Sequence, residues 1–208
     1  MKNFFKNLGL VFKNKNSTAQ ALWGAVGAPI SIAKMTGKHQ NFIEEFFNDP
    51  YLAGWLGGYI NFMLINFFKI TDATGRGEVL MKFYEFMDPD YFKGLDKFRK
   101  ISEIIKGHQD KKITKDAVDS AFMTVAMFIN SPSKVEFSSD TIYLKAKEFY
   151  ESGEWAKKAH IQNRVYGKIM GETKKSMEMP EHQAIAFRIM ETTFVEKLNK
   201  KFKVKSYI

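Results

Sequence analysis

The stretch DPYLAGWLGGYINFMLINFF, which runs from Asp49 to Phe68, decides the fold class of this chain. Asp49 followed by Pro50 is a typical helix start, because aspartate caps free backbone N–H groups and proline fits the first helical position. The 18 residues that follow, 51–68, carry no charge and form the most apolar run in the sequence. The stretch therefore predicts a long apolar helix, either buried in a protein core or inserted in a membrane.

The composition of this run favours the protein core. Its 18 residues reach the minimum length of a membrane span. However, Asn61, Asn66 and three glycines make its transfer into lipid less favourable than that of a leucine-rich span. We therefore interpret it as a buried central helix of about 51–70. A membrane hairpin made of residues 19–35 and 51–68 stays open as an alternative.

Two glycines of the run have the spacing that permits close approach between helices. Gly54 and Gly58 stand four positions apart, so both lie on one face of the predicted helix. This GxxxG spacing is found in membrane helices and in soluble ones, so it does not decide between the two settings. It indicates only that a neighbouring helix has room to pack closely there.

The remaining chain shows the apolar spacing of amphipathic helices joined by short polar connections. We predict an all-α fold, a compact multi-helix bundle with the buried helix of about 51–70 and a basic amphipathic helix at its N-terminus. Residues 1–16 are expected to form a basic arm, residues 17–199 the helical domain, and residues 200–208 a basic C-terminal tail.

Local signals set expectations for the ends of the first helices. Pro29 is expected to kink or end the helix within 19–35, because proline lacks a backbone N–H group. The sequence TDATGRG at 71–77 is expected to form a turn. Asp88 followed by Pro89 repeats the signal for a helix start.

The second half of the chain contains fewer clear signals for the start and end of helices. Thr114 is expected to cap a helix that runs towards residue 130. Residues 134–144 are ambiguous, and we expect a short extended piece followed by a helix from Thr141, capped by Ser139 or Asp140. The end of the chain alternates lysine with apolar residues, so residues 200–208 are expected to be an extended basic arm.

The composition excludes several classes of protein. With 45% hydrophobic and 15% aromatic residues, the chain is not intrinsically disordered. Because it contains no cysteine, it has no disulfide framework, no thiolate zinc site and no cysteine nucleophile. Its 208 residues suit one domain, or one domain with an arm.

The formal net charge of +9 is concentrated at the two ends of the chain. Residues 1–38 contain six lysines and no acidic residue, and residues 197–208 contain five lysines and no acidic residue. Basic ends of this kind indicate an anionic partner, although lysines also keep a phenylalanine-rich protein in solution. The lysines of the C-terminal end are Lys197, Lys200, Lys201, Lys203 and Lys205.

The first 14 residues have the pattern of an amphipathic helix that binds an interface. Aromatic and aliphatic side chains share one face, and lysines lie on the other. The apolar face consists of Phe4, Phe5, Leu8, Val11 and Phe12, and the basic face of Lys2, Lys6 and Lys13. These residues are our candidates for binding a membrane or a protein partner. The alternative is that the same apolar face docks on the core of this chain.

The sequence contains no recognisable catalytic or metal-binding motif. No two of its four histidines stand three or four positions apart, so no helical pair is available to bind a metal ion. There is no Gly-x-Ser-x-Gly motif for a serine nucleophile. His160 and His182 lie on predicted helices and are weak candidates for acid–base chemistry. We expect no metal, no cofactor and no catalytic residue.

Three functions remain open at this stage. The first is a non-enzymatic interaction protein that docks through its basic, apolar N-terminal elements on a membrane surface or a larger protein assembly. It would be cytoplasmic, with peripheral attachment to a membrane as an option. The second is a non-specific nucleic-acid-binding protein that uses its lysine-rich ends. It is disfavoured because neither basic end contains arginine and the chain between them is nearly neutral. The third is a helical enzyme or a carrier of apolar ligands with a Phe/Met-lined pocket. The oligomeric state is not predicted.

Overall fold

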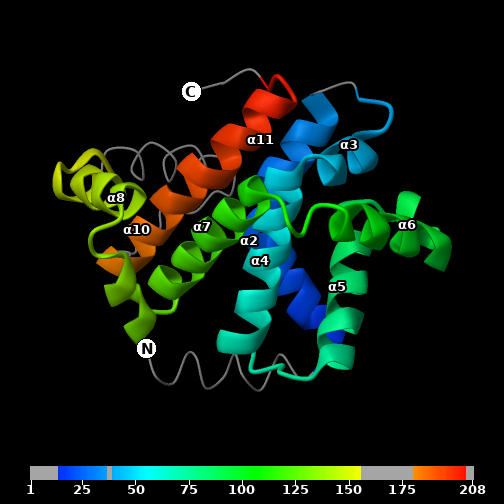
Figure 1. Ribbon diagram of the computed structural model, residues 1–208, viewed down its shortest axis with the longest axis horizontal. Helices are drawn as coiled ribbons and strands as arrows, with labels where there is room; N and C mark the ends of the chain where they lie inside the picture. The colour runs from blue at the N-terminus through cyan, green and yellow to red at the C-terminus, as the bar shows by residue number, and fades with distance from the viewer. Residues whose placement is uncertain (1–13, 37–38, 156–179, 205–208) are drawn as a thin grey trace, which may run out of the picture. The chain divides into compact units, whose positions relative to one another are not determined.

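A computed structural model of the chain describes residues 14–36, 39–155 and 180–204 (Figure 1). Within these ranges the chain forms nine α-helices and no β-strand, so the all-α prediction is confirmed. The helices are α2 (Lys15–Thr36), α3 (Phe42–Asn48), α4 (Pro50–Asn66), α5 (Ala73–Met87), α6 (Leu95–Lys106), α7 (Lys112–Phe128), α8 (Thr141–Glu151), α10 (Glu181–Met190) and α11 (Glu196–Lys201). There are also short 3-10 helices at Tyr91–Lys93 and Pro132–Phe137 and a π-helical segment at Glu191–Val195.

The chain divides into two compact units. The first holds the described residues up to Phe122 and those from Thr193 onward, and the second holds the described residues from Met123 to Thr192. The chain passes into the second unit within α7 and returns within the π-helical segment. Each unit buries apolar side chains of its own. The division into an arm, a helical domain and a tail stays a prediction.

Most of the apolar run 51–68 folds into α4, which begins as the sequence predicts. The Asp49 carboxylate accepts hydrogen bonds from two free N–H groups of the first turn, at 3.0 and 3.1 Å, and Pro50 occupies the first helical position. Ten of the 17 residues of α4 are buried. Among the described helices, none has both the length and the apolar content needed to cross a membrane.

A large cluster of buried aromatic rings surrounds Trp55 in the first unit. The Trp55 ring stacks with Tyr59 at 5.2 Å and with Phe194 at 4.3 Å between ring centroids. Its Nε1–H group donates a hydrogen bond of 3.1 Å to Thr193 Oγ1. Because Thr193 and Phe194 both belong to the π-helical segment, this segment supplies the indole with a hydrogen-bond acceptor and a stacking partner together.

Gly54 and Gly58 lie where α4 approaches α7, as their spacing indicated. A Cβ atom placed on Gly54 would stand 2.9 Å from Thr114 Cγ2 and 3.0 Å from the Thr114 carbonyl oxygen. A Cβ atom placed on Gly58 would stand 3.3 Å from Val118 Cα. The absence of side chains at these two positions therefore allows the backbones of the two helices to pack closely.

Helix α2 does not end at Pro29 but continues to Thr36. Of the two alternatives predicted at this proline, a kink or an end of the helix, the end is wrong for a physical reason. A proline removes one backbone hydrogen bond, whereas α2 buries apolar side chains on both sides of it, including Val26 and Ile30, and packs along α5. The energy of packing exceeds the loss of one hydrogen bond.

Two further boundaries differ from the prediction. The residues 71–77 do not form a simple turn, because Asp72 accepts a hydrogen bond of 2.6 Å from the Gly75 N–H group and α5 begins at Ala73. Asp88 does accept hydrogen bonds from the next free N–H groups, at 3.1 and 2.9 Å, but only a 3-10 turn follows. Helix α6 begins after Gly94, whose extended backbone separates the two helices.

The second half of the chain confirms one predicted cap and corrects two other expectations. Asp140 caps α8 by accepting hydrogen bonds of 2.7 and 3.4 Å, so the helix begins at Thr141 as expected. The piece before it is a 3-10 helix, Pro132–Phe137, rather than extended chain. Thr114 is not a cap, since α7 already begins at Lys112 and Thr114 lies within its first turn.

The second unit has a compact apolar core between α8 and α10. Six buried side chains form this cluster, namely Met123, Met127, Ala146, Ile185, Ala186 and Ile189. At its edge the Arg188 guanidinium lies 4.3 Å from the centre of the Phe149 ring, and its Nη1 atom is 2.7 Å from Glu191 Oε2. Arg188 thus makes both a cation–π contact and an ion pair beside the core.

Candidate functional site

The predicted docking residues of the N-terminal arm lie outside the described residues. These are Lys2, Phe4, Phe5, Lys6, Leu8, Val11, Phe12 and Lys13. The weak acid–base candidate His160 lies outside the described residues as well. The amphipathic docking helix therefore stays a prediction from the sequence.

The lysines of the C-terminal end lie mainly on a folded helix. Lys197, Lys200 and Lys201 belong to α11, and Lys205 lies outside the described residues. Lys197 Nζ stands 5.4 Å from the centre of the Tyr51 ring, and Lys201 Nζ is 3.8 Å from Asp49 Oδ2. Two of these lysines therefore contact α4 and its cap within the first unit.

The chain stays helical to Lys201 and is not extended from residue 200. Phe202, which follows, is fully buried, and the Val204 N–H group donates a hydrogen bond of 2.9 Å to the Asn199 carbonyl. Lys203 adopts a left-handed φ of 52°, which is typical of the residue after a helix end. The prediction of an extended arm was wrong here because Phe202 is buried in the first unit and holds the end of α11 in place. The alternation of lysine with apolar residues does not show which apolar residue is buried.

The described residues as a whole carry no excess of charge. Counted over 14–36, 39–155 and 180–204, they contain 21 lysines and arginines and 21 aspartates and glutamates. Several lysines of the basic ends have acidic partners there: Lys15 pairs with Glu78, and Lys34 with Asp88 at 2.8 Å. The net charge of +9 therefore comes from the segments outside the described residues.

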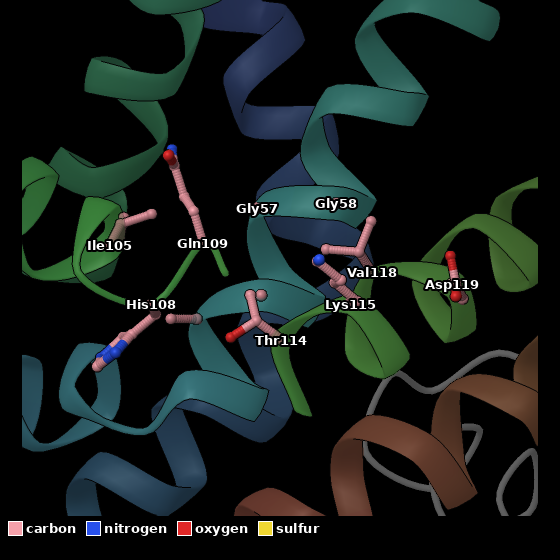
Figure 2. Close-up of a pocket in the computed structure, with 11 residues that line it drawn as sticks. Gly57, Gly58, Ile105, His108, Gln109, Thr114, Lys115, Val118 and Asp119 are labelled. Carbon is pink, nitrogen blue, oxygen red and sulfur yellow. The ribbon is translucent and has the colours of Figure 1, made fainter. Parts of the chain in front are cut away.

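The first unit contains a pocket of about 460 Å³ lined by three segments (Figure 2). Helix α4 provides Ala53 and three glycines, the end of α6 and the loop after it provide Ile105, His108 and Gln109, and the start of α7 provides four side chains. The residues from α7 are Thr114, Lys115, Val118 and Asp119. This volume lies within the range of small-molecule binding pockets.

The glycines of α4 leave this pocket open. Helix α7 lies against the Cβ positions of Gly54 and Gly58, but a Cβ atom on Gly57 would have no atom of the described residues within 4 Å. Gly57 therefore faces free space rather than a neighbouring helix. The same three glycines thus allow tight helix packing at two positions and an open floor at the third.

Two polar side chains that line the pocket carry buried atoms without a hydrogen-bond partner among the described residues. These atoms are His108 Nε2 and Thr114 Oγ1. The other ring nitrogen of His108, Nδ1, is 2.9 Å from Lys111 Nζ. Buried polar atoms are nearly always paired in folded proteins, so two such atoms in the residues that line one pocket are unusual.

The rim of the pocket carries charges that are not paired with described residues. Lys115 and Asp119 are both exposed on α7 and form no ion pair with any residue that the structure describes. Figure 2 shows the Lys115 ammonium directed from α7 towards the middle of the pocket. The start of α7 thus brings a free cation to an otherwise largely apolar site.

A second pocket, of about 380 Å³, lies in the second unit and contains His182. It is lined by Tyr143, Lys134 and Glu181, together with residues of α7, α10 and the 3-10 helix Pro132–Phe137. Burial, and next the nearby Lys134, lower the pKa of His182 below its ordinary value, while Glu181 opposes the shift. His182 is therefore the one of the two weak acid–base candidates that the structure places in a pocket.

The part of the chain that the structure describes contains no group of three or more histidine and acidic side chains arranged to hold a metal ion.

The pocket on α4 was not predicted from the sequence. The signal was the pair Gly57-Gly58, because only one of two adjacent helical glycines can face the same neighbouring helix.

Comparison with known proteins identifies no relative of this chain. No protein-family model matches the sequence. Searches of curated proteins and of solved structures likewise give no match. The function is therefore argued from the residues and the geometry alone.

Proposed function

We propose that this chain is a non-enzymatic helical interaction protein that docks on an anionic membrane surface or a larger protein assembly. Its basic, apolar N-terminal elements make the contact, and the predicted amphipathic helix at the N-terminus is the principal one. Cytoplasmic localisation with peripheral attachment to a membrane belongs to the same proposal.

The distribution of charge is the observation that supports this proposal. The described residues are electrically balanced, with 21 basic and 21 acidic side chains, so the framework itself does not attract anions as a whole. The segment 1–13 contains three lysines and no acidic residue. Attraction to an anionic partner is thus concentrated in segments such as this one rather than spread over the helices.

The outer face of α2 adds an apolar element next to this segment in the sequence. Ile32 is 44% exposed and Met35 is 74% exposed, and both belong to the small set of large apolar side chains that are exposed among the described residues. Gly24 and Ala28 continue the same exposed face towards the start of α2. This face lacks charge, so it suits contact with an apolar surface once the basic arm has bound.

The experiment is co-sedimentation of the purified full chain with vesicles of phosphatidylcholine alone and of phosphatidylcholine with phosphatidylserine. We expect binding to the anionic vesicles only and release at high salt. Deletion of residues 1–13 should abolish this binding while circular dichroism and the unfolding midpoint stay unchanged. Binding that survives the deletion would overturn the proposed role of the arm.

Two matched variants separate the contributions of charge and apolar contact. Replacing Lys2, Lys6 and Lys13 by glutamine keeps the apolar face, and replacing Phe4, Phe5 and Phe12 by serine keeps the charge. Both should weaken vesicle binding, the first by removing electrostatic attraction and the second by removing insertion at the interface. If the serine variant binds as well as the original chain, the interaction is purely electrostatic. An RNA or DNA partner, tested in parallel, would then become the better interpretation.

A further inference from the structure

We propose that the pocket lined by α4, the end of α6 and the start of α7 binds a small organic carboxylate. The apolar body of the ligand lies on the floor at Gly57 and Gly58, and its carboxylate pairs with Lys115. This site is independent of the docking function proposed above, because none of its lining residues belongs to the basic ends.

The shape of the pocket suits a compact apolar group. Its walls include Ile105, Val118 and Ala53, and its floor is made of glycine backbone. Because Gly57 has no atom within 4 Å of its Cβ position, a ligand can lie directly against the helix there. A volume of about 460 Å³ is large enough for a ligand of phenylacetate or octanoate size.

The hydrogen-bonding groups of the lining include one ammonium donor, Lys115, and one carboxylate acceptor, Asp119, one turn further along α7. Lys115 supplies an ammonium group without an ion pair among the described residues, and the buried Thr114 hydroxyl oxygen has no hydrogen-bond partner among them either. Since Lys111 Nζ can only donate, its contact of 2.9 Å with His108 Nδ1 leaves the imidazole proton on Nε2 when the ring is neutral. His108 Nε2 is therefore a buried donor without an acceptor among the described residues. Because the His108 and Thr114 atoms are buried, the donor that a ligand can reach is the exposed Lys115 ammonium.

The position of the pocket favours negative charge. Thr114 and Lys115 lie in the first turns of α7, a helix of 17 residues, where the helix dipole favours an anion. Asp119 stands one turn further along the helix, and its carboxylate repels an anion, most strongly one with more than one negative charge. A single carboxylate suits one free lysine better than a phosphate, which usually requires several cations.

The test is isothermal titration calorimetry on the full chain with phenylacetate and with octanoate. The alcohols 2-phenylethanol and 1-octanol serve as matched neutral probes. We expect one-to-one binding of at least one carboxylate. Lys115→Gln should weaken binding of that carboxylate about tenfold, the usual loss for one charge-assisted hydrogen bond, without changing binding of the alcohol.

Substitution of the floor tests the location of the site. Gly57→Leu should abolish binding, because the new side chain fills the open space. Gly24→Leu is the matched control, since Gly24 also has no atom within 4 Å of its Cβ position but lies on α2. Lys112→Gln is the matched control for charge, because Lys112 belongs to α7 but does not line the pocket. Both controls should bind as the original chain does.

Amide chemical shifts provide a second measurement that does not require the leucine variant to fold. Titration of the original chain with phenylacetate or octanoate should shift the amide signals of Gly57, Gly58 and Lys115. The proposal is overturned if neither carboxylate binds, if binding survives Gly57→Leu, or if the shifts map to a different part of the chain. It is equally overturned if Lys115→Gln leaves carboxylate affinity unchanged.

Discussion

At the scale of single residues, Glu44 links three segments that are distant in the sequence. Its Oε1 atom lies 2.7 Å from Lys100 Nζ on α6 and accepts a hydrogen bond of 3.0 Å from Tyr91 Oη in the 3-10 helix. The hydrogen bond from Lys100, and next the one from Tyr91, lower the pKa of Glu44 below its ordinary value of 4.5. The ionisation of Glu44 is therefore linked to the stability of the first unit.

The direction of this shift predicts how stability depends on pH. Because the pKa is lowered in the folded state, the contribution of Glu44 is complete above its ordinary pKa and is lost as the pH falls through the lowered value. Glu44→Gln should therefore reduce the free energy of unfolding at pH 7 and make it fall less steeply below about pH 4.5. Urea unfolding over this pH range measures both effects. Glu103→Gln, at an exposed position of α6, is the control, and an identical acid response in both variants would contradict the assignment.

At the scale of helices, the three glycines of α4 have different environments that give opposite predictions. Gly54→Ala would place a Cβ atom 3.0 Å from the Thr114 carbonyl oxygen, whereas Gly57→Ala would place one in free space. We expect Gly54→Ala to destabilise the chain by about 1 to 2 kcal/mol, since overpacking outweighs the better helix propensity of alanine. Gly57→Ala should stabilise it by up to about 1 kcal/mol. Chemical unfolding of both variants provides the comparison, and equal effects would show that α4 and α7 are not closely packed at Gly54.

The same helices show which features of the fold can be predicted from the sequence. Asp49 and Asp140 were predicted as caps because capping depends on a side chain and the backbone two or three residues away. A helix end at Pro29, one of two alternatives, and a turn at 71–77 were wrong, because packing continues α2 past the proline and Asp72 caps α5. The pocket was not predicted, since it depends on which face of α4 meets α7. Local chemistry is readable in one sequence, whereas tertiary approach is not.

At the scale of the whole molecule, the excess of positive charge lies outside the residues that the structure describes. The described residues balance 21 basic side chains with 21 acidic ones, although the complete chain carries +9. The sequence places the excess charge at the two ends of the chain, 1–38 and 197–208, which contain lysines and no acidic residue. It did not indicate that Lys15, Lys34 and Lys201 belong to the folded framework through acidic partners. Those partners are remote in the sequence, so only the structure identifies them.

The division into two units predicts that each can lose its structure without the other. Ile189 is fully buried in the cluster of the second unit, and Ile30 is fully buried on α2 of the first. Each substitution by alanine should destabilise its own unit by about 2 to 5 kcal/mol, because it leaves a cavity in a packed core.

Hydrogen–deuterium exchange distinguishes the two units within one experiment. In Ile189→Ala the amides of α8 and α10 should exchange faster, while those of α2 and α5 keep their protection, because opening below the global free energy of unfolding is local. Ile30→Ala should give the reverse pattern and serves as the matched control. If either variant raises exchange equally in both sets of helices, the units unfold as one. The passage of the chain through α7 and the π-helical segment would then be a cooperative link and not a boundary.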